Sequence, residues 1–135
     1  MRVDAYIATD IKGPRKRRGI AVGALSCVVN GETKWVPEGI GVTGGDRLAE
    51  ITALHITMKR LFPNKGSDVY VHTSSGYLTH GLYSIHTWES SGWKRKDGKP
   101  IAHVEYWKEI ANHLHGNHIS VLPEDPEATK RLLTE

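Results

Sequence analysis

The sequence contains a single cysteine, Cys27, among 135 residues, so a disulfide bond within the chain is impossible. Cys27 lies in an apolar stretch, where a buried free thiol is the ordinary interpretation. No apolar run approaches the ~18 residues that a membrane-spanning helix requires. The N-terminal segment carries Asp4 and Asp10 and lacks the apolar core of a signal peptide. These absences predict an intracellular, cytoplasmic protein.

Internal repeats, linkers and low-complexity segments are also lacking, which favours a single domain spanning residues 1–135. The formal net charge is only +3, but the positive charge is concentrated in two places. One is the basic run at 15–18, and the other follows Trp93. Such clusters favour polyanionic partners through counterion release, although each cluster by itself is equally typical of a solvated loop.

The hydrophobic pattern predicts strands and helices in a mixed order. Strands are expected at 3–9, 20–29, 33–42, 69–73 and 118–122, and helices at 47–62, 75–88, from about 103, and at 126–133. Asn30-Gly31 is a strong hairpin turn, Pro37 suggests an edge strand or a bulge, and Asp46 is a natural N-cap. This order predicts an α/β fold whose mixed sheet carries helices on both faces.

Two motifs carry a family resemblance. Thr73-Ser74-Ser75 ends the strand at 69–73, and Gly92-Trp93-Lys94 is followed by Lys99-Pro100. This series resembles ribonuclease HI, in which T-D-S-x-Y ends a strand and W-x-x-x-G-W-K-x-x-x-x-K-P builds a protrusion that grips nucleic acid. The resemblance spans essentially the whole chain and is strongest over 69–107. It implies a ribonuclease H-like fold with a five-stranded mixed sheet, and a monomer that binds RNA/DNA hybrid or another duplex.

The resemblance also identifies metal-binding positions. Ribonuclease H enzymes hold two Mg²⁺ ions with four carboxylates to hydrolyse a phosphodiester. Asp10 and Glu50 match the first and second positions, Ser74 stands in place of the third, and Leu132 falls at the fourth. A serine hydroxyl is a neutral, weak ligand, so Asp10 and Glu50 would hold Mg²⁺ or Mn²⁺ only weakly. We therefore expect cleavage to be absent or strongly impaired.

The acidic residues leave alternatives open. Glu50 lies off the apolar stripe of its helix, so it could simply pair with Arg47 on the surface. Glu124, Asp125 and Glu127 lie close to the fourth position and could supply a missing ligand. Their plainer explanation is negative charge at a helix N-terminus, which the helix dipole favours.

The binding features of the family are better retained. The predicted nucleic-acid-binding residues are Arg15, Lys16, Arg17, Arg18, Trp88, Lys94, Arg95, Lys96 and Lys99. Basic side chains at these positions would contact phosphates and give affinity without sequence readout. Trp93 and Trp107 are expected to pack in the core. Part of the family's grip is lost, because Glu89-Ser90-Ser91 stands where a basic triplet often precedes Gly92.

Three functional hypotheses follow. The first is a ribonuclease H-like protein that binds nucleic-acid duplex with catalysis lost or strongly impaired. The second is an active metal-dependent ribonuclease H that hydrolyses the RNA strand of RNA/DNA hybrids with non-standard ligands. The third is a non-catalytic scaffold or interaction module. A folded surface without a basic face would favour the third hypothesis.

Overall fold

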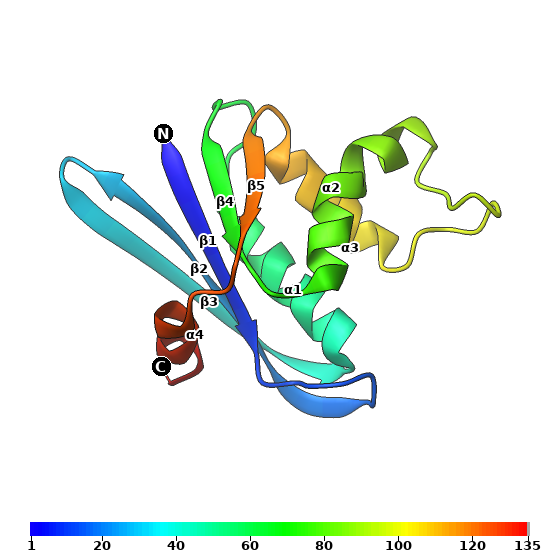
Figure 1. Ribbon diagram of the computed structural model, residues 1–135, viewed down its shortest axis with the longest axis horizontal. Helices are drawn as coiled ribbons and strands as arrows, with labels where there is room; N and C mark the ends of the chain where they lie inside the picture. The colour runs from blue at the N-terminus through cyan, green and yellow to red at the C-terminus, as the bar shows by residue number, and fades with distance from the viewer. Residues whose placement is uncertain (135) are drawn as a thin grey trace.

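The computed structural model describes residues 1–134 of the chain (Figure 1). Its elements are β1 (Arg2–Thr9), β2 (Arg17–Val29), β3 (Glu32–Gly44), α1 (Asp46–Met58), β4 (Asp68–His72), α2 (Gly76–Ser90), α3 (Val104–Leu114), β5 (His118–Leu122) and α4 (Pro126–Thr134). Within residues 1–134, no helix combines the length and the apolar character needed to cross a membrane.

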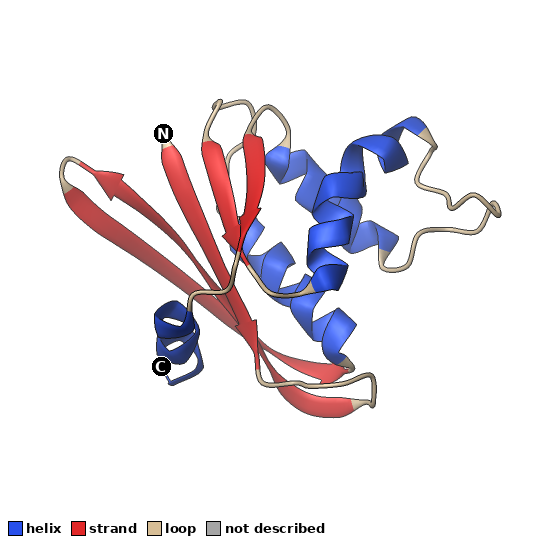
Figure 2. Ribbon diagram, viewed as in Figure 1, coloured by secondary structure: helices blue, strands red, loops and turns tan. Residues whose placement is uncertain are grey.

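The strands form one mixed sheet in the order β3-β2-β1-β4-β5 (Figure 2). β1, β2 and β3 pair in antiparallel register, whereas β4 pairs with β1 and β5 with β4 in parallel register. The predicted five-stranded mixed sheet is therefore confirmed. The hairpin turn is confirmed as well, with φ angles of 52° at Asn30 and 79° at Gly31. Pro37 lies in the edge strand β3, as its missing N–H favours.

Helices cover both faces of the sheet, as the sequence predicted. Figure 1 shows α1, α2 and α3 on one face and α4 on the other. The side chains of β1 alternate accordingly: Ala5 and Ile7 enter the main core with the three helices, while Ala8 packs with Ala24 of β2 and Leu132 of α4. β1 is thus a central strand that is covered on both faces, which fixes the position of its C-terminal end.

Two element boundaries differ from the prediction by three residues or more. β2 begins at Arg17 rather than at residue 20, because Arg17 and Arg18 pair with β3. Only the first half of the basic run therefore lies in a loop. α1 ends at Met58 rather than at residue 62. Leu61 is nevertheless buried, because its N–H donates to the Met58 carbonyl (2.9 Å) and this tight turn prolongs the helical spacing beyond the helix.

The prediction that Asp46 caps α1 is wrong. Gly45 is the N-cap, and the Asp46 carboxylate accepts a hydrogen bond from the Arg47 N–H (2.8 Å). The Asp46 N–H donates to the Gly13 carbonyl (2.9 Å), which holds the loop between β1 and β2 against the start of α1. A Cβ at Gly45 would lie 2.7 Å from the Pro14 carbonyl oxygen, so the close approach requires glycine. Contact with the loop fixes where the helix begins.

Aromatic packing joins α2 to α3. Trp107 is fully buried, as expected, and Trp93 packs partly buried against the same core. The ring centroids of Trp88 and Trp107 lie 5.6 Å apart. A Cβ at Gly81 would lie 2.2 Å from the Trp107 ring, so the absence of a side chain there lets the two helices approach. This contact anchors the base of the segment between α2 and α3, which projects from the body of the fold (Figure 2).

Substitution of Gly81 by alanine tests this contact. We expect Gly81→Ala to lower the free energy of unfolding by about 1–3 kcal/mol, because the added methyl group overpacks the buried indole. The matched control is Gly76→Ala in the first turn of the same helix, where an added Cβ meets no atom within 4 Å. Urea unfolding followed by tryptophan fluorescence measures both. Equal stability of the two variants would contradict the packing described here.

Candidate active site and nucleic-acid interface

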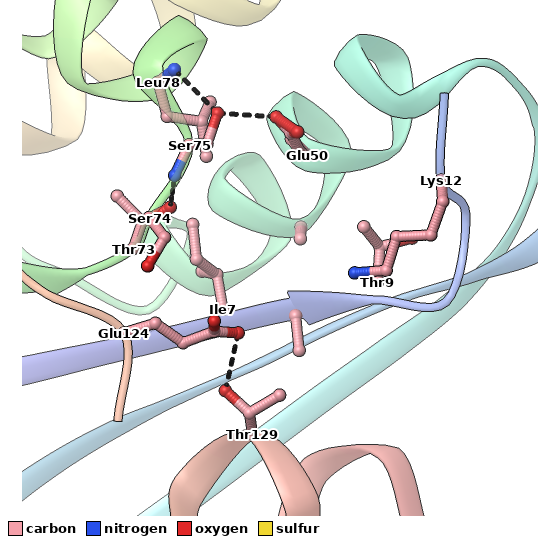
Figure 3. Close-up of a pocket in the computed structure, with 12 residues that line it drawn as sticks. Ile7, Thr9, Lys12, Glu50, Thr73, Ser74, Ser75, Leu78, Glu124 and Thr129 are labelled. Carbon is pink, nitrogen blue, oxygen red and sulfur yellow. Dashed lines mark hydrogen bonds between the residues drawn. The ribbon is translucent and has the colours of Figure 1, made fainter. Parts of the chain in front are cut away.

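A cavity of about 220 Å³ opens where β1 and β4 end, beside the first turns of α2 and the middle of α1 (Figure 3). In parallel sheets the carboxyl ends of the strands are the usual place for a site. Its polar lining consists of Thr9, Lys12, Glu50, Thr73, Ser74, Ser75, Glu124 and Thr129. These residues come from segments far apart in the sequence, which the sheet brings to one edge. We call this cavity the central pocket.

Glu50 projects from α1 into the central pocket. Its carboxylate accepts a hydrogen bond from the Ser75 hydroxyl (2.5 Å). Burial raises the pKa of Glu50 above its ordinary 4.5, because removal from water penalises the charged form. The Ser75 hydrogen bond opposes this rise in pKa, as do the positive charges of Lys12 and Arg47. The predicted alternative, a surface carboxylate paired with Arg47, does not describe this half-buried position.

The segment Thr73-Ser74-Ser75 forms the wall opposite Glu50. The Ser75 hydroxyl caps α2 by accepting from the Leu78 N–H (3.1 Å), and the Ser75 N–H donates to the Thr73 hydroxyl (3.0 Å). Ser74 follows β4 directly and lines the central pocket. The sequence therefore identified a position at the pocket, and that position carries a neutral hydroxyl. Its role in metal binding or catalysis stays a prediction.

Of the acidic residues before and within α4, Glu124 lines the central pocket. Its carboxylate accepts from the Thr129 hydroxyl at 2.9 Å (Figure 3). Asp125 instead caps α4, accepting from the backbone N–H groups of Glu127 (3.0 Å) and Ala128 (3.2 Å). Leu132, which the sequence comparison placed at the fourth carboxylate position, lies in α4 and is buried against Ala8 and Ala24 of the sheet. Glu124 thus approaches the site from the end of β5.

Asp10 lies outside the lining of the central pocket. Its carboxylate accepts from the Ile20 N–H (2.8 Å), across the mouth of the loop that joins β1 to β2. The preceding residue, Thr9, lines the pocket in its place. Asp10 is therefore absent from the pocket lining that contains Glu50, and the role of these two residues as a metal pair stays a prediction. The donor to the Asp10 carboxylate is a backbone N–H of the neighbouring strand β2. No local pattern of residues predicts such a contact.

The central pocket does not fit the two-metal site that its family resemblance implies. Among residues 1–134, no group of three or more His, Cys, Asp or Glu side chains is arranged to hold a metal ion. The carboxylates that line the pocket are Glu50 and Glu124, accompanied by hydroxyl groups and the Lys12 ammonium. Mg²⁺ is held mainly by carboxylate charge, whereas hydroxyl groups are neutral, weak ligands and an adjacent ammonium group repels a metal ion.

A second depression adjoins the central pocket across the first turn of α2. It encloses about 470 Å³ and is lined by Arg47, Gly76, Tyr77, His80, Trp88, Arg95, Ile101, Ala102 and Trp107. We call it the lateral groove. The Arg47 guanidinium lies 5.4 Å from the centre of the Tyr77 ring. Two predicted binding residues, Trp88 and Arg95, are therefore brought to one groove. Arg47 and His80 were not identified from the sequence, whereas Tyr77 is the tyrosine of the T-S-S-G-Y motif.

The basic segment between α2 and α3 has defined turns. Lys94 and Pro100 form an isolated β-bridge, and the Arg95 N–H donates to the Lys99 carbonyl (2.7 Å). The Arg95 side chain pairs with Asp97 at 3.3 Å. This hairpin exposes Lys94, Arg95, Lys96 and Lys99. Of these four residues, Arg95 also lines the lateral groove. Their contact with nucleic acid stays a prediction.

The other basic cluster lies at the opposite side of the two depressions. Arg15, Lys16, Arg17 and Arg18 are all exposed. The hydrogen bond from the Asp46 N–H to the Gly13 carbonyl holds their loop beside the start of α1, which also carries Arg47. The first cluster therefore lies by the start of α1, whereas the second lies in the segment between α2 and α3 that projects from the body of the fold (Figure 1). Positive charge is therefore exposed at both clusters, and whether the two clusters form one binding face stays a prediction.

Comparisons with known proteins agree with this architecture. No family model matches the chain. A ribonuclease H of Enterobacter sp. (strain 638) is 33% identical over 81 residues, which cover 59% of this chain and 50% of that protein. A ribonuclease H of Citrobacter koseri is 31% identical over 81 residues, with the same coverage of 59% and 50%. The chain spans about half the length of the curated relatives it matches.

Solved structures extend the similarity to the whole fold. LC9-RNase H1, described as a type 1 RNase H with the type 2 active-site motif, superposes with a TM-score of 0.71 at 16% identity, covering 98% of this chain and 71% of that one. The RNase H domain of PFV superposes with a TM-score of 0.67 at 18% identity, covering 98% and 91%. The chain therefore has a ribonuclease H-like fold. The central pocket lies where β1 and β4 end, next to the positions that Asp10 and Ser74 hold in the sequence.

Glu50 gives a pH-dependent test of the central pocket. Because its folded-state pKa is raised, its contribution to stability is full below the ordinary value of 4.5 and is lost as the pH rises through the raised pKa. We therefore expect Glu50→Gln to be more stable than the parent at pH 7, with the difference vanishing below pH 4.5. Urea unfolding at several pH values measures this.

The matched control is Glu89→Gln, which removes one negative charge at an exposed position of α2. Charge removal there tests whether a general change in net charge explains the result. A Glu50→Gln variant that is less stable than the parent at pH 7, with the control unchanged, contradicts the buried-carboxylate description.

Proposed function

We propose that this protein binds nucleic-acid duplex, with RNA/DNA hybrid as the preferred class, and that hydrolysis is lost or strongly impaired. One observation carries the proposal. The lateral groove and its flanking basic clusters adjoin a central pocket that is rich in hydroxyl groups and poor in carboxylates. Binding needs exposed positive charge, whereas metal-dependent cleavage needs converging negative charge. The chain has exposed positive charge, but few carboxylates converge in its central pocket.

The structural neighbours support nucleic acid as the partner. The foamy viral protease-reverse transcriptase was solved in complex with RNA/DNA hybrid, and it superposes with a TM-score of 0.67 at 21% identity, covering 98% of this chain and 19% of that one. The same kind of viral protein was also solved in complex with dsDNA. For the present chain, Arg15–Arg18 and Lys94–Lys99 would contact phosphates, with Trp88 and Tyr77 lining the path between them.

The alternative is an active metal-dependent ribonuclease H with non-standard ligands. Glu124 favours it, because this carboxylate lines the central pocket together with Glu50. In that case Mg²⁺ or Mn²⁺ would bind weakly between two carboxylates, with a phosphate oxygen of the substrate completing the ligands. Asp10 would have to leave the Ile20 N–H to take part.

A cleavage assay separates the two functions. We expect no hydrolysis of an RNA/DNA hybrid in Mg²⁺ or in Mn²⁺, because the central pocket lacks the carboxylate charge that holds two metal ions. Gel analysis of a labelled RNA strand measures this, with dsDNA and dsRNA as additional substrates. Robust turnover that disappears in Glu124→Gln and in Glu50→Gln would establish the alternative instead.

Salt dependence tests the basic loop. We expect Arg15→Gln combined with Lys16→Gln to lower the slope of log K against log salt by up to about 2, since each lost phosphate contact removes ~0.9 for a duplex. The matched control, Lys59→Gln with Lys65→Gln, removes the same charge at exposed positions near the other end of α1. Fluorescence anisotropy with labelled hybrid measures both. Equal slopes for the parent and the loop variant would refute a role for the loop.

A further inference from the structure

Lys12 is the basic residue that lines the central pocket. The chain on either side of it is fixed: Ile11 is 2% exposed, and the Gly13 carbonyl accepts from the Asp46 N–H (2.9 Å). The Ile11 N–H donates in addition to the Thr9 hydroxyl (3.1 Å). Lys12 is therefore held between two anchored residues, and Figure 3 shows its side chain extending toward Thr9 with the amino group turned into the pocket.

The charges around this ammonium group are of opposite sign. Glu50 and Glu124 line the same cavity, and the charge of Lys12 favours the ionised form of Glu50. The other polar groups in the lining are hydroxyls, which are neutral. A divalent cation entering this space would be repelled by the ammonium charge and would lose part of the attraction of the two carboxylates. The positive charge in this cavity is therefore supplied by a side chain of the protein, that of Lys12.

We propose that Lys12 is the resident cation of the central pocket, which balances Glu50 and Glu124 and hinders the binding of divalent metal ions there. The same ammonium group contacts a phosphodiester oxygen of a bound strand without a metal ion, a part of the inference that rests on the proposed function. Lysine suits this task because its ammonium is a compact point charge on a flexible stem. It stabilises a bound phosphate but supplies no metal-bound hydroxide for hydrolysis.

A Mn²⁺ titration tests the first part without nucleic acid. Free Mn²⁺ is measured by electron paramagnetic resonance for the parent protein, Lys12→Gln, and Lys59→Gln as a control for the loss of one exposed positive charge. We expect Lys12→Gln to bind Mn²⁺ on the order of tenfold more tightly than either of the others, because a repelling charge has gone. The gain is expected to disappear when Glu50→Gln is added to Lys12→Gln.

Two results would overturn this part: equal Mn²⁺ affinity in the parent and Lys12→Gln, including undetectable binding by both, or a gain that persists with Glu50→Gln. Circular dichroism of each variant establishes that the fold is intact before the titration. Because Lys12 is exposed on a loop, its replacement leaves the packed core unchanged.

Binding of labelled hybrid in EDTA tests the second part. We expect Lys12→Gln to weaken binding severalfold relative to Lys59→Gln, because a phosphate contact is lost in the absence of metal. Unchanged affinity would overturn direct phosphate contact by Lys12. If the parent itself binds no duplex, the proposed function fails together with this second part, whereas a Mn²⁺ gain in Lys12→Gln still supports the resident cation.

Discussion

The site of this protein depends on the position of β1, which is paired on both edges and covered on both faces. β2 pairs with it in antiparallel register and β4 in parallel register. Because β1 and β4 run in the same direction, their C-terminal ends meet at one edge of the sheet. The pairing of β1 with β4 therefore keeps the first residues after both strands close to one another. Thr9 and Ser74 both line the central pocket for that reason.

The two helices that begin near this edge give the pocket its character. α1 presents Glu50, and the N-terminal turn of α2 presents the Ser75 hydroxyl that bonds to it. The carboxylate is stabilised by a neutral donor, while burial raises its pKa. The central pocket is thus lined by hydroxyl groups, two carboxylates and an ammonium group. It is a poor match to a pair of divalent ions, which require concentrated negative charge.

Binding and chemistry use separate parts of such a fold. The basic clusters lie on a loop that continues into the start of β2 and on a hairpin, and exposed charges at such places can contact phosphates without strict geometry. Metal-dependent hydrolysis instead requires several carboxylates to converge within a few ångströms. A chain can therefore keep its basic surface while the central pocket changes. Ser74 lines the central pocket and Leu132 of α4 is buried against the sheet, and neither residue lines the lateral groove.

The sequence by itself determined the order of strands and helices, the hairpin at Asn30-Gly31 and the edge position of Pro37, because alternation, turn chemistry and the missing proline N–H act locally. It also indicated that Glu50 and Ser74 lie near one site. Tertiary structure decided where β2 begins, where α1 begins and ends, and which groups line the pocket. Asp10 bonds to the Ile20 N–H, Lys12 is held by anchors at Ile11 and Gly13, and Glu124 arrives from the end of β5. Each of these depends on contacts between segments distant in the chain, which no local pattern of residues encodes.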